Sequence, residues 1–265
     1  MKLTQDNYYS QSANQAFLSV SQYKDFAGTL SRPACEEQAL AKLNGTWEQK
    51  KTTSLLVGSY VDSFMEGTLD KFKAENPEIF KKDGELKSDY LKANEIIKRI
   101  ERDELFMTFM SGEKQVIMTA EMFGAEWKIK MDAYAENLAI VDLKVMASLR
   151  DMKWTKDYGY MNFVHQWGYT IQSAVYQEVV YRNTGKRLPF FLAAVSKEEY
   201  PDIEIIQLEQ NLMDEALIEV ERNTPNIVAL KNGEIKPTRC GVCDYCKHTK
   251  VLTRPIWSSE LVGEV

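Results

Sequence analysis

The fold is decided by residues 129–145, which read IKMDAYAENLAIVDLKV. Two strand-like segments in this stretch are separated by a polar turn at Glu136 and Asn137. Because side chains in a strand alternate between faces, Asp142 and Lys144 point to one face and Leu143 to the other. Burial of a carboxylate and an ammonium costs several kcal/mol unless each has a partner. The two charges therefore mark a candidate site in an otherwise apolar strand.

The length of the turn decides whether this site has a second carboxylate. A three-residue loop at 136–138 places Asp132 opposite Asp142, with their Cβ atoms about 5 Å apart. Two carboxylates that close repel each other unless a cation lies between them, and Mg²⁺ or Mn²⁺ with oxygen ligands would satisfy both. A two-residue loop instead puts the carboxylates on opposite faces. The simpler alternative is a buried ion pair between Asp142 and Lys144, with Asp132 solvated.

Helices and strands are expected on both sides of this hairpin. The apolar spacing from Phe17 to Phe26 predicts a helix that Ser19 or Ser21 caps and that Gly28 and Pro33 end. The other expected helices cover residues 53–65, 88–102, 156–184 and 209–230, and the expected strands cover 115–122, 126–135, 138–146, 189–196 and 203–208. This order predicts a mixed α/β domain with N-terminal and C-terminal additions.

Composition limits the classes of function. The chain has 265 residues with 44% hydrophobic and 27% charged residues, which is ordinary for a globular protein. Its 33 basic and 39 acidic side chains give a net charge of −6, which argues against a coat over a polyanion but allows a local basic groove. No signal peptide and no apolar run of about 20 residues is visible, so we expect a soluble, cytoplasmic protein.

Four motifs occur in an order that resembles PD-(D/E)xK nucleases. The first is Asp132, followed after nine residues by Asp142-Leu143-Lys144. Three further segments resemble the RecE-like and RecB-like phage-type exonucleases of this superfamily, namely residues 19–23, 58–62 and 169–176. The last segment carries Gln172 and Tyr176, which share one helix face because they are four residues apart.

The resemblance implies an α/β fold with a restriction-endonuclease-like core, a central mixed sheet and flanking helices. It implies one nuclease domain over 1–265, with a helical N-terminal part at 1–110, a catalytic core at 111–208 and a C-terminal helix with a cysteine-rich tail at 209–265.

The resemblance also implies the roles of single residues. The catalytic residues would be Asp132, Asp142, Lys144, Gln172 and Tyr176, with Gln172 orienting Lys144 or contacting the DNA and Tyr176 packing beside it. The metal ligands would be Asp62, Asp132, Asp142 and the Leu143 carbonyl, with Glu66 as the alternative to Asp62. The residues after the motif that we expect to bind DNA are Arg150, Lys153, Trp154 and Lys156; their alternative interpretation is a solvated loop and helix start.

A second candidate site is the sequence Cys240-Gly-Val-Cys243-Asp-Tyr-Cys246, a C-x2-C-x2-C pattern. Three thiolates need a fourth ligand, which either Cys35 or His248 could supply. One cysteine before the core and three after it resembles the iron–sulfur variants of RecB-like nucleases, which implies a 4Fe–4S cluster. Zn²⁺ is the alternative metal, and unliganded thiols or a local disulfide are the alternative without metal.

These features predict a Mg²⁺-dependent DNA exonuclease, and the resemblance implies that it digests linear duplex DNA from an end. The resemblance implies 5′ to 3′ digestion in phage or prophage recombination, a single-strand annealing partner, a homo-oligomer and a location in the cytoplasm of a bacterium or phage-infected host. The alternatives are an iron–sulfur RecB-type or CRISPR-associated nuclease, an endonuclease, a non-catalytic DNA-binding module of the same fold, and a redox protein that uses the cysteines.

Overall fold

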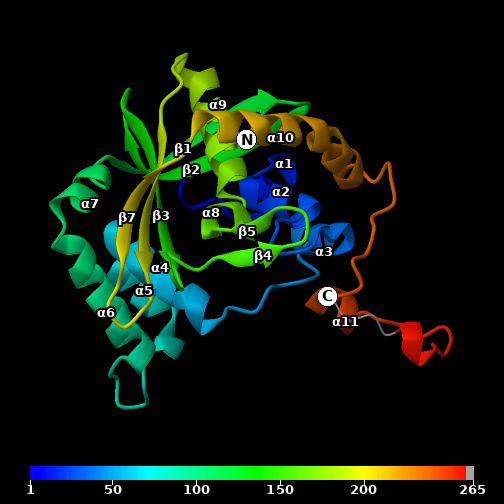
Figure 1. Cartoon of the computed structure of the whole chain (residues 1–265), viewed down its shortest axis with the longest axis horizontal. Helices are drawn as coiled ribbons and strands as arrows, with labels where there is room; N and C mark the ends of the chain where they lie inside the picture. Colours follow the sequence, from blue (N-terminus) through cyan, green and yellow to red (C-terminus); the bar gives the residue numbers. More distant parts are fainter. Residues whose placement is uncertain (261–265) are drawn as a thin grey trace.

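Five strands form one mixed sheet in the order β1-β2-β3-β6-β7 (Figure 1). Strands β3 and β6 are parallel, and the other neighbours are antiparallel. The chain is described by a computed structural model over residues 1–260; the last five residues of the predicted cysteine-rich tail lie outside the described residues. The strands are β1 (Glu113–Met122), β2 (Ala125–Ala135), β3 (Ala139–Met146), β6 (Phe190–Ser196) and β7 (Ile203–Gln207). The predicted mixed α/β class is confirmed, and each strand lies within two residues of its predicted bounds.

The β2–β3 hairpin has the odd-length loop on which the candidate site depends. Ala135 pairs with Ala139, so residues 136–138 form the loop, and Asn137 adopts a left-handed φ of 64°. The same register carries Asp132 opposite Asp142. Ladder pairing between β2 and β3 stops one residue before this pair, at Ala133 and Val141. The two strands therefore separate where the carboxylates lie.

The N-terminal chain occupies the edge of β2 that β3 leaves free. Leu18 forms a parallel bridge with Trp127, donating to the Glu126 carbonyl and accepting from the Lys128 amide. Helix α2 (Val20–Ala27) begins immediately afterwards, and the Ser19 hydroxyl caps it by accepting from the Gln22 amide. This bridge fixes the start of α2 beside the separated strands.

Helices cover both faces of the sheet. Buried residues of α2, α9 (Tyr169–Thr184) and α10 (Gln210–Lys231) form one hydrophobic core, and those of α4 (Thr53–Met65), α6 (Ser88–Glu101) and α7 (Glu104–Phe109) form the other. The remaining elements are α1 (Gln11–Ala16), α3 (Glu36–Leu43), α5 (Leu69–Glu75), η1 (Pro77–Ile79), α11 (Asp244–His248) and η2 (Ser258–Glu260). Within residues 1–260, no helix has both the length and the apolar character that crossing a membrane needs.

The prediction of one long helix over 156–184 is wrong. Residues 153–161 form a two-stranded hairpin, β4 (Lys153–Thr155) and β5 (Gly159–Met161), and the short helix α8 (Phe163–Gln166) precedes α9. Gly159 and Gly168 both adopt left-handed φ values, 71° and 60°, which interrupt a helix. The aromatic residues of this segment also favour strands over helices.

Candidate active site and cysteine cluster

A cavity of about 420 Å³ opens where β2 and β3 separate. It collects side chains from α2, α4, α9 and the two strands, together with the N-terminal segment around Tyr8 and Tyr9. The predicted site residues that line this one cavity are Asp62, Glu66, Asp132, Asp142, Leu143, Lys144, Gln172 and Tyr176.

The two carboxylates of the hairpin are held by neighbouring groups rather than by bulk water. Asp132 accepts a hydrogen bond from the Leu143 amide at 2.8 Å and a weaker one from the Gln115 side chain at 3.4 Å. Asp142 accepts from the Gln172 amide group at 2.6 Å and forms an ion pair with Lys144. Burial raises the pKa of Asp132 well above its usual range, and Asp142 and Asp62 raise it further. Lys144 therefore pairs with Asp142, while hydrogen bonds alone hold Asp132 among the described residues.

Lys144 stays protonated in this environment. Burial alone lowers the pKa of its ammonium, but Asp142, Tyr169 and Asp132 outweigh burial and raise that pKa above its ordinary value. The ion pair between Asp142 and Lys144 in the simpler interpretation is thus present. Asp132 is nevertheless half-buried beside them and hydrogen-bonded to the Leu143 amide and the Gln115 side chain.

Asp62 approaches the hairpin from helix α4, with Glu66 one turn further along. Burial raises the pKa of the Asp62 carboxyl to about 7, and Glu66 contributes in the same direction. Lys144 and Lys130 oppose this shift. A carboxyl from a separate helix therefore joins the two from the hairpin.

Gln172 and Tyr176 connect α9 to the two strands. Gln172 donates to Asp142, so it orients that carboxylate directly and not the Lys144 ammonium. The Tyr176 hydroxyl donates to the Lys130 carbonyl at 3.1 Å, which ties α9 to β2. Both side chains are buried.

The backbone of Leu143 also faces the separated edge. Its amide donates to Asp132, and within a strand the N–H and C=O of one residue point to the same neighbour. The Leu143 carbonyl is consequently directed towards the side of β3 on which Asp132 lies.

The residues predicted to bind DNA lie outside the cavity lining. Lys153, Trp154 and Lys156 are exposed on the β4–β5 hairpin, where Trp154 pairs across the strands with the equally exposed Tyr160. Arg150 forms ion pairs with Asp202 and Glu204, which occupy its guanidinium.

Sequence reasoning missed four lysines that line the cavity, Lys24, Lys42, Lys128 and Lys130. A signal was present for three of them. Lys24 follows Val20 by four residues, so it shares the inward face of its helix. Lys128 and Lys130 alternate with the fully buried Ile129, so they share the strand face of Asp132.

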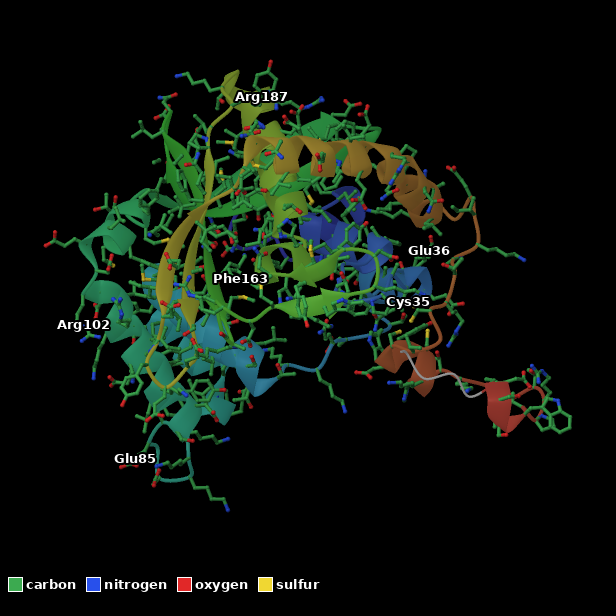
Figure 2. The ribbon with its side chains drawn as sticks, in the orientation of Figure 1. Cys35, Glu36, Glu85, Arg102, Phe163 and Arg187 are labelled. Atoms are coloured by element: carbon green, nitrogen blue, oxygen red, sulfur yellow. The ribbon has the colours of Figure 1, made fainter. Side chains whose placement is uncertain are left out.

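The four cysteines come together although Cys35 is more than 200 positions from the others. Figure 2 labels Cys35 and the neighbouring Glu36. Their sulfur atoms all lie within 4.8 Å of one another. The Cys35–Cys246 sulfur distance is 3.5 Å and the Cys240–Cys246 distance is 3.9 Å. His248 stacks against Trp47 with ring centroids 5.5 Å apart and is not one of the four clustered ligands.

Thiol acidity differs around the cluster. Burial raises the pKa of Cys35 and raises that of Cys243 to about 12. Burial also acts to raise the pKa of Cys240, but the backbone amides of Cys243 and Val242 outweigh it and lower this pKa to about 7. Cys240 is accordingly the thiol that loses its proton most readily among these three.

Helix α3 fixes the tail that carries three of the cysteines. Glu36 accepts hydrogen bonds from the Thr238 amide and hydroxyl at 2.7 and 2.8 Å, and Arg239 pairs with Glu37 at 2.7 Å. Cys35 is the N-cap residue of this same helix. These contacts hold the tail segment at 238–239 against the start of α3.

A mixed sheet with one buried carboxylate, two half-buried carboxylates and a lysine at the opening of a hairpin defines the PD-(D/E)xK class. The chain belongs to the family described as a PDDEXK-like domain of unknown function (DUF3799), which matches residues 19–249. The predicted membership of the PD-(D/E)xK nuclease superfamily is confirmed. The chain is also similar to a protein from Eubacterium rectale with a crystal structure and the name "Putative exonuclease", at 58% identity and a TM-score of 0.97 over 100% of both chains. A comparison with curated proteins finds no match.

Proposed function

We propose that the protein is a divalent-metal-dependent exodeoxyribonuclease that digests linear duplex DNA from an end. The observation that carries this proposal is the convergence of Asp62, Asp132, Asp142 and Lys144 on one cavity. The name "Putative exonuclease" of the Eubacterium rectale protein supports action at the end of a strand.

The donor set fits a hard dication. Three carboxylates and a backbone carbonyl are the oxygen ligands that Mg²⁺ or Mn²⁺ prefers. The carboxylates repel one another, and a bound dication would neutralise their negative charge. Asp62, Asp132, Asp142 and the Leu143 carbonyl would hold it. When bound, the ion supplies Lewis-acid stabilisation of the phosphate and makes a water molecule more acidic.

The side chains of the cavity supply the remaining parts of the hydrolysis. The protonated Lys144 orients the attacking water and donates a hydrogen bond as negative charge develops on the phosphate oxygens. Gln172 and the Leu143 amide keep the carboxylates of Asp142 and Asp132 in fixed orientations. Water adds to phosphorus, the P–O bond to the leaving nucleotide breaks, and the leaving oxygen takes up a proton.

Duplex DNA would lie along the β4–β5 hairpin. Lys153 and Lys156 are exposed there and would contact phosphates, while Trp154 would stack on a base at the end. Arg150 belongs to the same proposal, but it has to exchange Asp202 and Glu204 for phosphate oxygens.

The biological setting is proposed from the motif resemblance. The order of the four motifs supports 5′ to 3′ digestion, a role in phage or prophage recombination with a single-strand annealing partner, assembly into a homo-oligomer, and a cytoplasmic location.

The cysteine cluster would hold a structural metal. Zinc binds thiolates at about 2.3 Å, so four of them around one ion lie about 3.8 Å apart. Two of the sulfur pairs here lie 3.5 and 3.9 Å apart, and all four sulfur atoms lie within 4.8 Å of one another. Thiolates of a 4Fe–4S cluster each bind a different iron and so lie further apart. The spacing favours the zinc alternative over the 4Fe–4S cluster.

The proposed function is tested by incubating the purified protein with linear and covalently closed circular duplexes, with Mg²⁺ or with EDTA. We expect the linear duplex to be digested and the closed circle to stay intact, and we expect digestion only when Mg²⁺ is present. Label at the 5′ or the 3′ end reports the direction, and Asp142→Asn, purified in parallel, excludes a contaminating nuclease. Equal cutting of the closed circle, or no cutting with Mg²⁺ or Mn²⁺, contradicts the proposal.

A further inference from the structure

Lys24 of α2 is a cation in the cavity that the proposed hydrolysis does not use. Its side chain lines the cavity beside Lys144. Among the described residues it has neither a hydrogen bond nor an ion pair for its ammonium. The adjacent acid, Asp25, is engaged elsewhere, with Arg32 at 2.8 Å and Lys42 at 3.1 Å.

Packing of its stem fixes the position of this ammonium. A Cβ atom built on Gly168 would lie 3.4 Å from the Cε atom of Lys24, so the lysine stem packs against the backbone that precedes α9. Its Nζ atom lies 5.0 Å from the centroid of the Tyr169 ring, and the Nζ atom of Lys144 lies 4.9 Å from the same centroid. The two ammonium groups are therefore no more than about 10 Å apart.

The surroundings leave the Lys24 charge uncompensated. Burial lowers the pKa of its ammonium to about 7, and Lys144 and Arg32 act in the same direction. Asp142 opposes them, but its two oxygens already bind Gln172 and Lys144. The half-buried ammonium has the face of the Tyr169 ring beside it but no carboxylate bound to it among the described residues, so an anion that enters the cavity would gain more from Lys24 than from a solvated lysine.

We propose that Lys24 binds a phosphate group of the DNA strand that enters the active site. The inference rests on the proposed function and adds a specific contact to it. A strand carries one charge per 3.4 Å of helix axis, so two cations within about 10 Å can hold neighbouring phosphates of one strand. Lys144 then contacts the phosphate that lies beside the carboxylates. Lys24 binds a neighbouring phosphate and so fixes the position of the DNA strand along the active site.

The test compares the parent protein with Lys24→Met, Lys24→Arg and the control Lys92→Met, which removes an exposed charge on α6. Binding of a labelled linear duplex is measured by fluorescence anisotropy with Ca²⁺ in place of Mg²⁺, over a range of salt concentrations. Lys24→Met should weaken binding about tenfold and reduce the salt slope by about 0.7 to 0.9, while Lys24→Arg and Lys92→Met stay close to the parent. In digestion assays Lys24→Met should raise KM more than it lowers kcat.

Probes with a terminal phosphate or a terminal hydroxyl distinguish the two sources of phosphate. A loss confined to the phosphorylated end means that Lys24 binds the terminal group, and an equal loss on both means an internal phosphodiester; each supports the proposal. If the parent digests DNA and Lys24→Met, folded by circular dichroism, binds with unchanged Kd and salt slope, the proposal is overturned while the nuclease assignment stands. A parent that neither binds nor digests DNA overturns both.

Discussion

Neutralising Asp62 should stabilise the metal-free protein, and by an amount that depends on pH. The carboxyl has a pKa of about 7 in the folded chain against 3.8 ordinarily. Because the pKa of Asp62 is higher in the folded chain than in the unfolded chain, folding favours the protonated carboxyl. The stability that this group contributes is fully present below pH 3.8 and is lost as the pH rises through 7. One pKa unit corresponds to about 1.36 kcal/mol, so Asp62→Asn should raise the free energy of unfolding by about 4 kcal/mol at pH 8 and by little near pH 4.

Urea unfolding in EDTA at several pH values measures this difference. Asp70→Asn on the exposed surface of α5 is the control and should stay within about 0.5 kcal/mol of the parent. Added Mg²⁺ should reverse the order, because an ion at 100 times its Kd stabilises the parent by about 2.7 kcal/mol and the variant by less. A destabilisation by Asp62→Asn that is equal at pH 5 and pH 8 would refute the account of a repelling carboxylate.

Three further changes test the fold and the cluster. Gly112→Ala should lower the free energy of unfolding in urea by about 1–3 kcal/mol, because its Cβ would lie 2.7 Å from the backbone of Tyr134. Gly58→Ala, with open space around the added Cβ, should be neutral or stabilising. Equal effects of the two substitutions would contradict this prediction. Tyr176→Phe should cost about 1 kcal/mol and lower Tm by a few degrees through loss of its hydrogen bond to β2, so an unchanged Tm speaks against that link. Metal analysis after anaerobic purification should give about one zinc per chain and no sulfide in the parent. Cys35→Ser should remove the bound metal and lower Tm. If the variant binds as much metal as the parent, Cys35 is excluded as a ligand.

The hairpin and the pairing of its carboxylates could be predicted because they depend on whether the loop has an odd or an even number of residues. A loop of three residues fixes the register, and the register alone sets Asp132 opposite Asp142. The positions of the five strands along the chain needed nothing beyond apolar runs and turns, but their order in the sheet was not predicted. Clustering of Cys240, Cys243 and Cys246 was likewise visible as spacing.

The position of α2 could not be predicted in this way. It depends on the bridge between Leu18 and Trp127, which joins segments about 110 residues apart and has no counterpart in local periodicity. Lys24 enters the cavity only through that bridge, although its place on the inward helix face was visible. The β4–β5 hairpin was missed because apolar spacing over 156–184 was counted through Gly159 and Gly168, whose left-handed backbone ends a helix.

The most direct measurement is the initial rate of digestion of a linear duplex by Lys144→Ala with Mg²⁺, beside the parent and Lys92→Met. Lys144 acts on the transition state, so the rate should fall by about 10² or more, while circular dichroism and duplex binding in Ca²⁺ change little. A rate within about tenfold of the parent would contradict the assignment of this cavity as the active site.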